Sequence, residues 1–147
     1  MRTEVRNNVH GGDGAVTFVH LLEKEDMAGK ASFAARISVP VGESIGTHLH
    51  ENDAAIFIIV SGTAMFDDNG TLNTLTAGDA CFTNAGESHG IRNAGDTALE
   101  IIGIVIFQRF SQPVAPSIAD ASYREGEMVC NPASNINICT PDFHMIW

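Results

Sequence analysis

Three histidines are the residues of this chain whose types and spacing best suit metal chemistry. His48 and His50 lie two residues apart in the segment GTHLHEND, directly before an apolar run at 56–60. Because side chains alternate between the two faces of a strand, both imidazoles are expected to point to the same side. Burying neighbouring imidazoles is costly unless their nitrogens are paired, and a divalent metal ion pairs them well. A third ligand is available in His89, which follows a glycine-containing turn. The sequence therefore predicts one metal site built from these three residues.

The segments that must position these histidines have the pattern of short strands. Strands are expected at 15–22, 32–39, 55–60, 63–66, 71–75, 80–83, 89–92 and 98–110. The pair Asn69-Gly70 between two apolar runs is typical of a tight hairpin turn. The first residues, 2–10, are interpreted as a polar segment. Many short strands, frequent turn signals and almost no helical periodicity predict an all-β fold of the jelly-roll barrel type.

Two segments of the chain resemble the two sequence motifs of the cupin family. The residues at the family's spacing are Gly42, His48, His50 and Gly62 in the first motif and Gly78, Gly86, His89 and Asn93 in the second. Matches at eight fixed positions are far more specific than an isolated pair of histidines. The resemblance covers roughly residues 14–109 and implies a double-stranded β-helix with metal bound by the three histidines.

The chain departs from the family's pattern at two places. Ala54 and Ala55 occupy both positions permitted for the glutamate of the first motif, and Asn84 replaces the proline of the second. Since a methyl group cannot bind a metal, the place of the glutamate should be taken by water, by the substrate or by a nearby carboxylate. Asp53 is the nearest carboxylate, and we interpret it as a residue of the pocket rim.

The register of the first motif also predicts the walls of a substrate pocket. Ala55 faces inward in that register, so alternation along the strand places Phe57 and Ile59 inward as well. These three residues would give a mostly apolar cavity with the metal as its main polar feature.

Composition limits the remaining function classes. A chain of 147 residues suits one barrel domain, expected at residues 1–110, and 44% hydrophobic against 18% charged residues excludes a disordered protein. The net charge of −10 argues against nucleic acid or an anionic membrane as partner. The sequence has no membrane-length apolar run and no apolar leader, and its three cysteines form no disulfide framework, so we expect a cytoplasmic protein.

The last residues, 111–147, differ in character, with many prolines and an apolar end. We expect an extension that packs on the barrel or on a partner subunit, most simply in a homodimer. The alternative is a lid that brings His144 or Trp147 to the pocket.

Three functions fit these features. Three neutral imidazoles leave the charge of a divalent metal uncompensated, which favours a small substrate that is anionic or chelating. The favoured hypothesis is a non-haem iron dioxygenase that uses Fe(II), because three-histidine iron centres occur in cupin-like dioxygenases. The alternatives are a redox-neutral isomerase, lyase or cyclase, and a cupin that binds a small molecule without turnover. Zn, Ni, Mn or Cu suit imidazole ligands as well as iron does.

Overall fold

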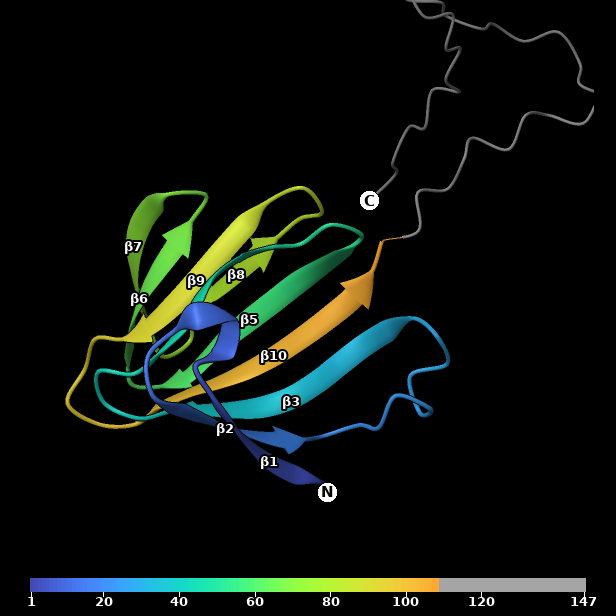
Figure 1. The fold of residues 1–147 in the computed structure, drawn as a ribbon, viewed down its shortest axis with the longest axis horizontal. Coiled ribbons are helices and arrows are strands. Elements are labelled where there is room, and N and C mark those ends of the chain that lie inside the picture. The colour runs from blue at the N-terminus through green and yellow to red at the C-terminus, as the bar shows by residue number, and fades with distance from the viewer. Residues whose placement is uncertain (109–147) are drawn as a thin grey trace, which may run out of the picture. The chain divides into compact units, whose positions relative to one another are not determined.

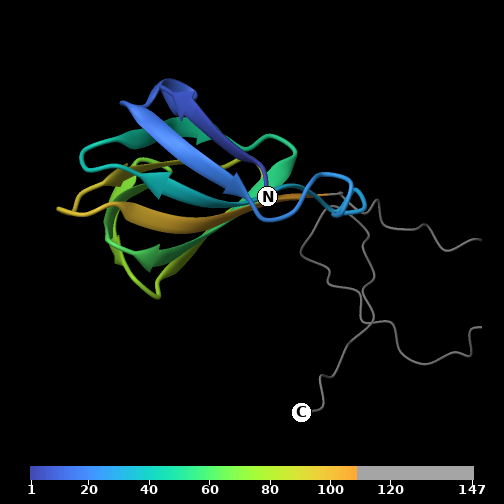
Figure 2. The ribbon, with the colours of Figure 1, turned by 90° about the horizontal axis from the view of Figure 1, so that it is seen from below.

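A computed structural model describes residues 1–108, which form two antiparallel sheets (Figure 1). The larger sheet contains, in spatial order, β1 (Thr3–Asn7), β2 (Ala15–His20), β3 (Ala31–Val39), β10 (Leu99–Phe107), β5 (Asp53–Ser61) and β8 (Ala80–Thr83). The smaller sheet contains β4 (Ser44–Leu49), β9 (Ser88–Asn93), β6 (Thr63–Asp68) and β7 (Thr71–Thr76). The two sheets face each other, as the view in Figure 2 also shows. The predicted all-β double-stranded β-helix is therefore confirmed.

The core lies between the two sheets and follows from strand alternation. Along β5 and β10 every second side chain points inward, so that Ile59 and Ile101 are almost completely buried. Phe66 and Ile91 come from β6 and β9 of the smaller sheet and join the same cluster. Each fully buried side chain of this size contributes about 1.5–3 kcal/mol. This packing fixes the strands that carry the histidines.

The predicted hairpin turn is present between β6 and β7. Asn69 and Gly70 have φ values of 49° and 88°, which is the left-handed conformation that a two-residue hairpin turn requires. The register of the pair runs without a shift from Asp68 opposite Thr71.

The N-terminal residues form a strand that side-chain periodicity does not reveal. β1 pairs with β2, with Glu4 opposite Phe18 and Arg6 opposite Val16. The apolar residue of β1, Val5, is 63% exposed, so the strand forms through backbone pairing rather than through burial of an apolar face. The segment at residues 2–10 is polar, as expected, and β1 within it is a strand that its side-chain pattern does not predict.

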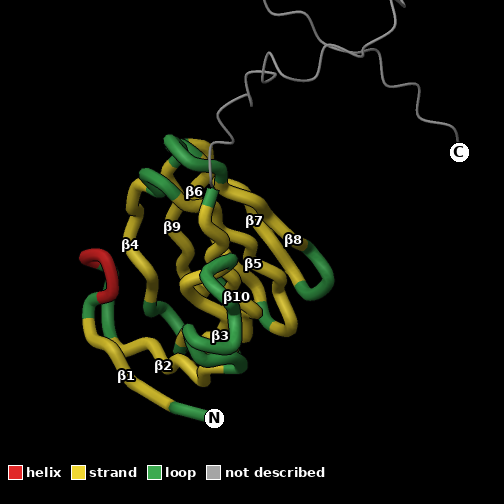
Figure 3. Tube along the Cα trace, turned by 90° about the vertical axis from the view of Figure 1, so that its right-hand side faces the viewer, coloured by secondary structure: helices red, strands yellow, loops and turns green. Residues whose placement is uncertain are grey.

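A short 3-10 turn, η1 (Val9–Gly11), lies against β4 (Figure 3). Glycines on both sides permit this close approach. A Cβ atom on Gly46 would lie 2.2 Å from the carbonyl oxygen of His10, and one on Gly12 would lie 2.3 Å from that of Ser44. Only residues without a Cβ fit here, so the backbone of the N-terminal segment docks directly on β4.

Residues 109–147 lie outside the described part of the chain. The predicted extension from residue 111 and the lid residues His144 and Trp147 therefore stay predictions. Within residues 1–108, no helix is long and apolar enough to cross a membrane.

We predict that Gly46→Ala destabilises the fold by about 1–3 kcal/mol, because the new methyl group overpacks the contact with the η1 backbone. Urea unfolding of the full-length protein measures the loss. Gly95→Ala is the matched control, since its methyl group would approach no other atom closer than 3.4 Å. An equal loss in both variants would show that the close contact at Gly46 is not the cause.

Candidate metal centre

The structure brings together the three histidines that the sequence singled out. His48 on β4 stands directly opposite His89 on β9. β4 ends at Leu49, but His50 continues the extended chain, since its backbone N–H donates to the carbonyl of Glu87 at 2.9 Å. One ligand atom from each of the three side chains lies within 4.8 Å of the other two.

Two of the imidazoles are fixed in one tautomer by their neighbours. Nδ1 of His48 donates to the carbonyl oxygen of Gly46 at 2.9 Å, and Nδ1 of His50 donates to Oδ1 of Asp53 at 2.6 Å. A carbonyl and a carboxylate can only accept, so the hydrogen is on Nδ1 and the lone pair is on Nε2. Asp53, predicted to lie at the rim, thus makes the contact that orients His50.

The third imidazole, that of His89, is hydrogen-bonded to a hydroxyl group that can pair with either tautomer. Nδ1 of His89 lies 2.7 Å from the hydroxyl oxygen of Thr83, which can donate or accept. Its Nε2 lies 3.2 Å from Nε2 of His50, a contact that needs one hydrogen. Without a metal, His89 carries that hydrogen and Thr83 donates to Nδ1. With a metal on Nε2, Nδ1–H donates to Thr83 instead.

Burial favours the uncharged form of His48 and His89. Burial is the main cause that lowers the pKa of His89 to about 3, and the nearby His48 and His50 add to the effect. Burial also lowers the pKa of His48 below its ordinary value. Neutral imidazoles at neutral pH are the form that binds a metal ion, so no proton has to be displaced from these two side chains.

The donor set fits a divalent metal ion. Two nitrogens that are each about 2.1 Å from one ion lie about 3.0–3.4 Å apart in octahedral or tetrahedral geometry. The separation of 3.2 Å between Nε2 of His50 and Nε2 of His89 falls in this range. Hydrogen-bonded Nδ1 atoms are the usual support of metal-binding histidines. Within residues 1–108, this cluster is the one group of side chains found with metal-ligand spacing.

The histidines open into a cavity of about 510 Å³. Ala55, at the place of the motif glutamate, lines it, and Phe57 lines it while stacking on His89 with ring centroids 4.8 Å apart. Ile59 differs from the prediction, because it lies deeper in the core and does not line the cavity. Other apolar wall residues are Val9, Phe18, Phe33, Ile37, Ile45, Leu49 and Val105.

Several residues at the site escape sequence reasoning. The ring of His10 stacks on His48 with centroids 3.7 Å apart and an angle of 10°. Arg6 also lines the cavity. Both come from the polar N-terminal segment, where no motif or periodicity marks them. The docking of η1 on β4 brings His10 to the site, and the pairing of β1 with β2 brings Arg6. Thr83 lies in a four-residue strand whose sequence gives no sign of a contact with His89.

We predict that His48→Ala, His50→Ala or His89→Ala each removes stoichiometric metal from the purified protein, because each deletes one of three ligands. Asp53→Ala should weaken metal affinity by about 10–100-fold, because His50 loses the partner that orients it. Elemental analysis and chelator competition measure these effects. His20→Ala is the control, since this buried histidine lies outside the cluster and should leave metal content unchanged. Full metal content in all three single variants at the cluster would contradict the assignment.

Comparison with known proteins agrees with this fold. The family model described as Cupin domain matches residues 35–107. The chain is 46% identical over 100 residues to the oxalate-binding protein of Thermotoga maritima, covering 68% of this chain and 83% of that protein. A crystal structure described as a predicted oxalate decarboxylase from Thermotoga maritima is 44% identical, with a TM-score of 0.72 over 74% of this chain and 94% of that one. The cupin domain of Schizosaccharomyces pombe Cnp3 shares the fold at 15% identity, with a TM-score of 0.58 over 71% of this chain and 69% of that domain. With this identity over most of a cupin relative, and with both cupin motifs built into facing strands, the chain belongs to the cupin family.

Proposed function

We propose that this protein binds a small dicarboxylate of the oxalate class through a divalent metal ion held by His48, His50 and His89. The observation that carries the proposal is the convergence of three hydrogen-bonded imidazoles in the wall of a mostly apolar cavity. The similarity to a protein named oxalate-binding supports the choice of ligand class.

The charge at the site explains the preference for an anion. A bound divalent metal would supply positive charge and open coordination positions to carboxylate oxygens. Ala55 contributes no negative charge where the motif has glutamate. The acidic surface of the protein acts mainly at long range and is screened over about 10 Å at 0.1 M salt. A small anion that reaches the cavity therefore meets a net attraction.

Binding without turnover suits the described cavity better than catalysis does. Its carboxyl groups are Glu51 and Asp53, and Asp53 is already engaged with His50. Among the described residues, Ala55 leaves no proton donor or acceptor at the glutamate position of the motif. A non-haem iron dioxygenase is the alternative, favoured by the all-histidine ligand set, and a redox-neutral lyase or isomerase is a further one.

We predict that oxalate binds at least ten-fold more tightly to metal-loaded than to metal-free protein. Calorimetric titration of full-length protein loaded with Mn(II), Zn(II), Ni(II) or Fe(II) under nitrogen measures the affinity. The His89→Ala variant serves as control and should show no such difference. Equal affinity with and without metal would contradict the proposal.

The same preparations separate binding from catalysis. Formate or carbon dioxide production from oxalate would indicate a lyase. Oxygen uptake that requires Fe(II) and an added chelating substrate would indicate a dioxygenase. Binding with neither outcome is the result expected for a receptor.

We also propose a homodimer, supported by apolar side chains on the outer face of the larger sheet. Ile58 and Val60 on β5 and Phe82 on β8 are exposed there. The register places Ile102 of β10 opposite Ile58, which makes this apolar face continuous across three neighbouring strands. An apolar face of this kind on a sheet suits contact with a second copy of the chain.

We predict that Phe82→Glu converts the dimer to a monomer, because a carboxylate would be buried in the apolar interface. Light scattering after gel filtration measures the molar mass over a range of concentrations. Leu72→Glu is the matched control, since Leu72 is 65% exposed on β7 of the other sheet. A dimer that persists in the Phe82 variant would exclude this face as the interface.

A cytoplasmic location is the third part of the proposal. Within residues 1–108 Cys81 has no disulfide partner, and burial raises the pKa of its thiol to about 11. A protonated, partly buried thiol of this kind suits a reducing compartment, where no disulfide has to form.

A further inference from the structure

We propose that Arg6, which β1 supplies, recognises the second anionic group of the bound ligand and so selects dianions over monoanions. This inference rests on the proposed function. The metal site alone would take any small carboxylate, whereas a cation elsewhere in the cavity wall adds a requirement for a second charge.

The position of Arg6 is the first observation. Arg6 lines the same cavity as the three histidines, and of the described lining residues it is the only lysine or arginine. The chain as a whole carries a net charge of −10, with eight lysines and arginines against eighteen acidic residues. A permanently charged guanidinium in the wall of the cavity that holds the candidate metal site is therefore a local exception to the acidic surface.

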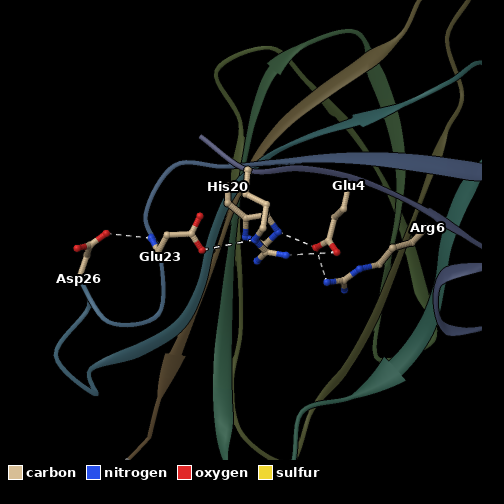
Figure 4. A network of polar contacts seen from close by, with 6 residues as sticks. Glu4, Arg6, His20, Glu23 and Asp26 are labelled. Carbon is tan, nitrogen blue, oxygen red and sulfur yellow. Dashed lines mark hydrogen bonds and ion pairs between the residues drawn. The ribbon is translucent and has the colours of Figure 1, made fainter.

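The orientation of Arg6 is the second observation. Its guanidinium donates to Oε1 of Glu4 at 2.5 Å and lies over the ring of Phe18, 5.0 Å from the ring centroid. Figure 4 shows this network, in which His20 contacts the same oxygen of Glu4 at 2.6 Å. The contacts with Glu4 and Phe18 hold the guanidinium of Arg6 in place. A ligand therefore loses little binding free energy to the ordering of a mobile side chain.

This hydrogen-bond network keeps the Glu4 carboxylate ionised and bonded to Arg6. The hydrogen bond from His20 is the main cause that lowers the pKa of Glu4, and the bond from Arg6 adds to it. Arg2 also pairs with Glu4, at 3.5 Å. Because Glu4 is shared among these partners, it offsets the charge of Arg6 only in part.

The guanidinium keeps donors for a ligand. An arginine has five N–H groups in a planar fork, and Glu4 is its one hydrogen-bond acceptor among residues 1–108. The side chain is 49% exposed, so a ligand in the cavity can reach it. A carboxylate could accept two parallel hydrogen bonds from the remaining donors, which is the strongest arrangement for such a pair.

The place of Arg6 in the chain favours a role in ligand specificity rather than in the fold of the barrel. The match to the family model begins at residue 35, so β1 and Arg6 lie outside it. His10, which stacks on His48, comes from the same N-terminal segment. The barrel thus supplies the histidines, while the N-terminal segment supplies the guanidinium in the cavity wall.

The test compares oxalate with acetate on metal-loaded, full-length protein. Arg6→Gln should weaken oxalate binding by at least ten-fold, change acetate binding by less than about two-fold, and leave metal content unchanged, because hydrogen bonds to charged groups are worth about this much. Arg6→Lys should restore part of the loss, since it keeps the charge but not the planar fork. Arg36→Gln is the matched control, because Arg36 is exposed and bonded to Glu100 at 2.7 Å away from the cavity.

The other possible results of this test would each contradict a defined part of the proposal. Unchanged oxalate affinity in Arg6→Gln would overturn the role of Arg6 while leaving metal-dependent binding intact. Equal weakening of oxalate and acetate, or loss of metal, would also overturn it, since Arg6 would then act through general charge or through structure. Failure of the unsubstituted metal-loaded protein to bind oxalate would overturn both this inference and the proposed function.

Discussion

The hydrogen bond at Nδ1 of each cluster histidine is the constraint on which the candidate site depends. Gly46 on β4, Asp53 on β5 and Thr83 on β8 supply the three partners, so both sheets contribute. One ring nitrogen of each of the three side chains lies within 4.8 Å of the other two. Burial alone would leave three imidazoles with unpaired nitrogens, which costs free energy. The jelly roll therefore stabilises the apo site through these partners, and a metal ion would use an arrangement that already exists.

The N-terminal segment completes the site by a second, independent contact. Its backbone reaches β4 only because Gly12 and Gly46 lack a Cβ atom. This contact places the ring of His10 flat on one face of the His48 imidazole. Arg6 follows from the pairing of β1 with β2. The positions of His10 and Arg6 thus depend on backbone contacts of the N-terminal segment, whereas the positions of the three histidines depend on side-chain burial between the sheets.

The sequence predicts the barrel and the convergence of the histidines for a physical reason. The four glycines of the two motifs, at 42, 62, 78 and 86, have φ values of 75°, 90°, 95° and 84°, which other residues rarely adopt. They fix where strands begin and end, so the spacing from glycine to histidine carries structural information. The contacts of Thr83 and His10 carry no such signal, because they join segments distant in the sequence through ordinary polar residues. The sequence does not predict β1 for a related reason, because an edge strand with one apolar side chain shows no alternation of polar and apolar residues.

The alanine at position 55 makes sense when the charges in the cavity are considered together. A divalent cation held by three neutral imidazoles carries two positive charges into a partly apolar cavity, and Ala55 offsets neither of them. A dianion would neutralise this charge completely, whereas acetate would leave one charge with reduced solvation. Arg6 is already offset in part by Glu4, and Asp53 is bonded to His50 and 31% exposed to solvent. A glutamate at position 55 would cancel one positive charge and shift the preference toward monoanions. The absent carboxylate and the presence of Arg6 therefore favour the same class of ligand.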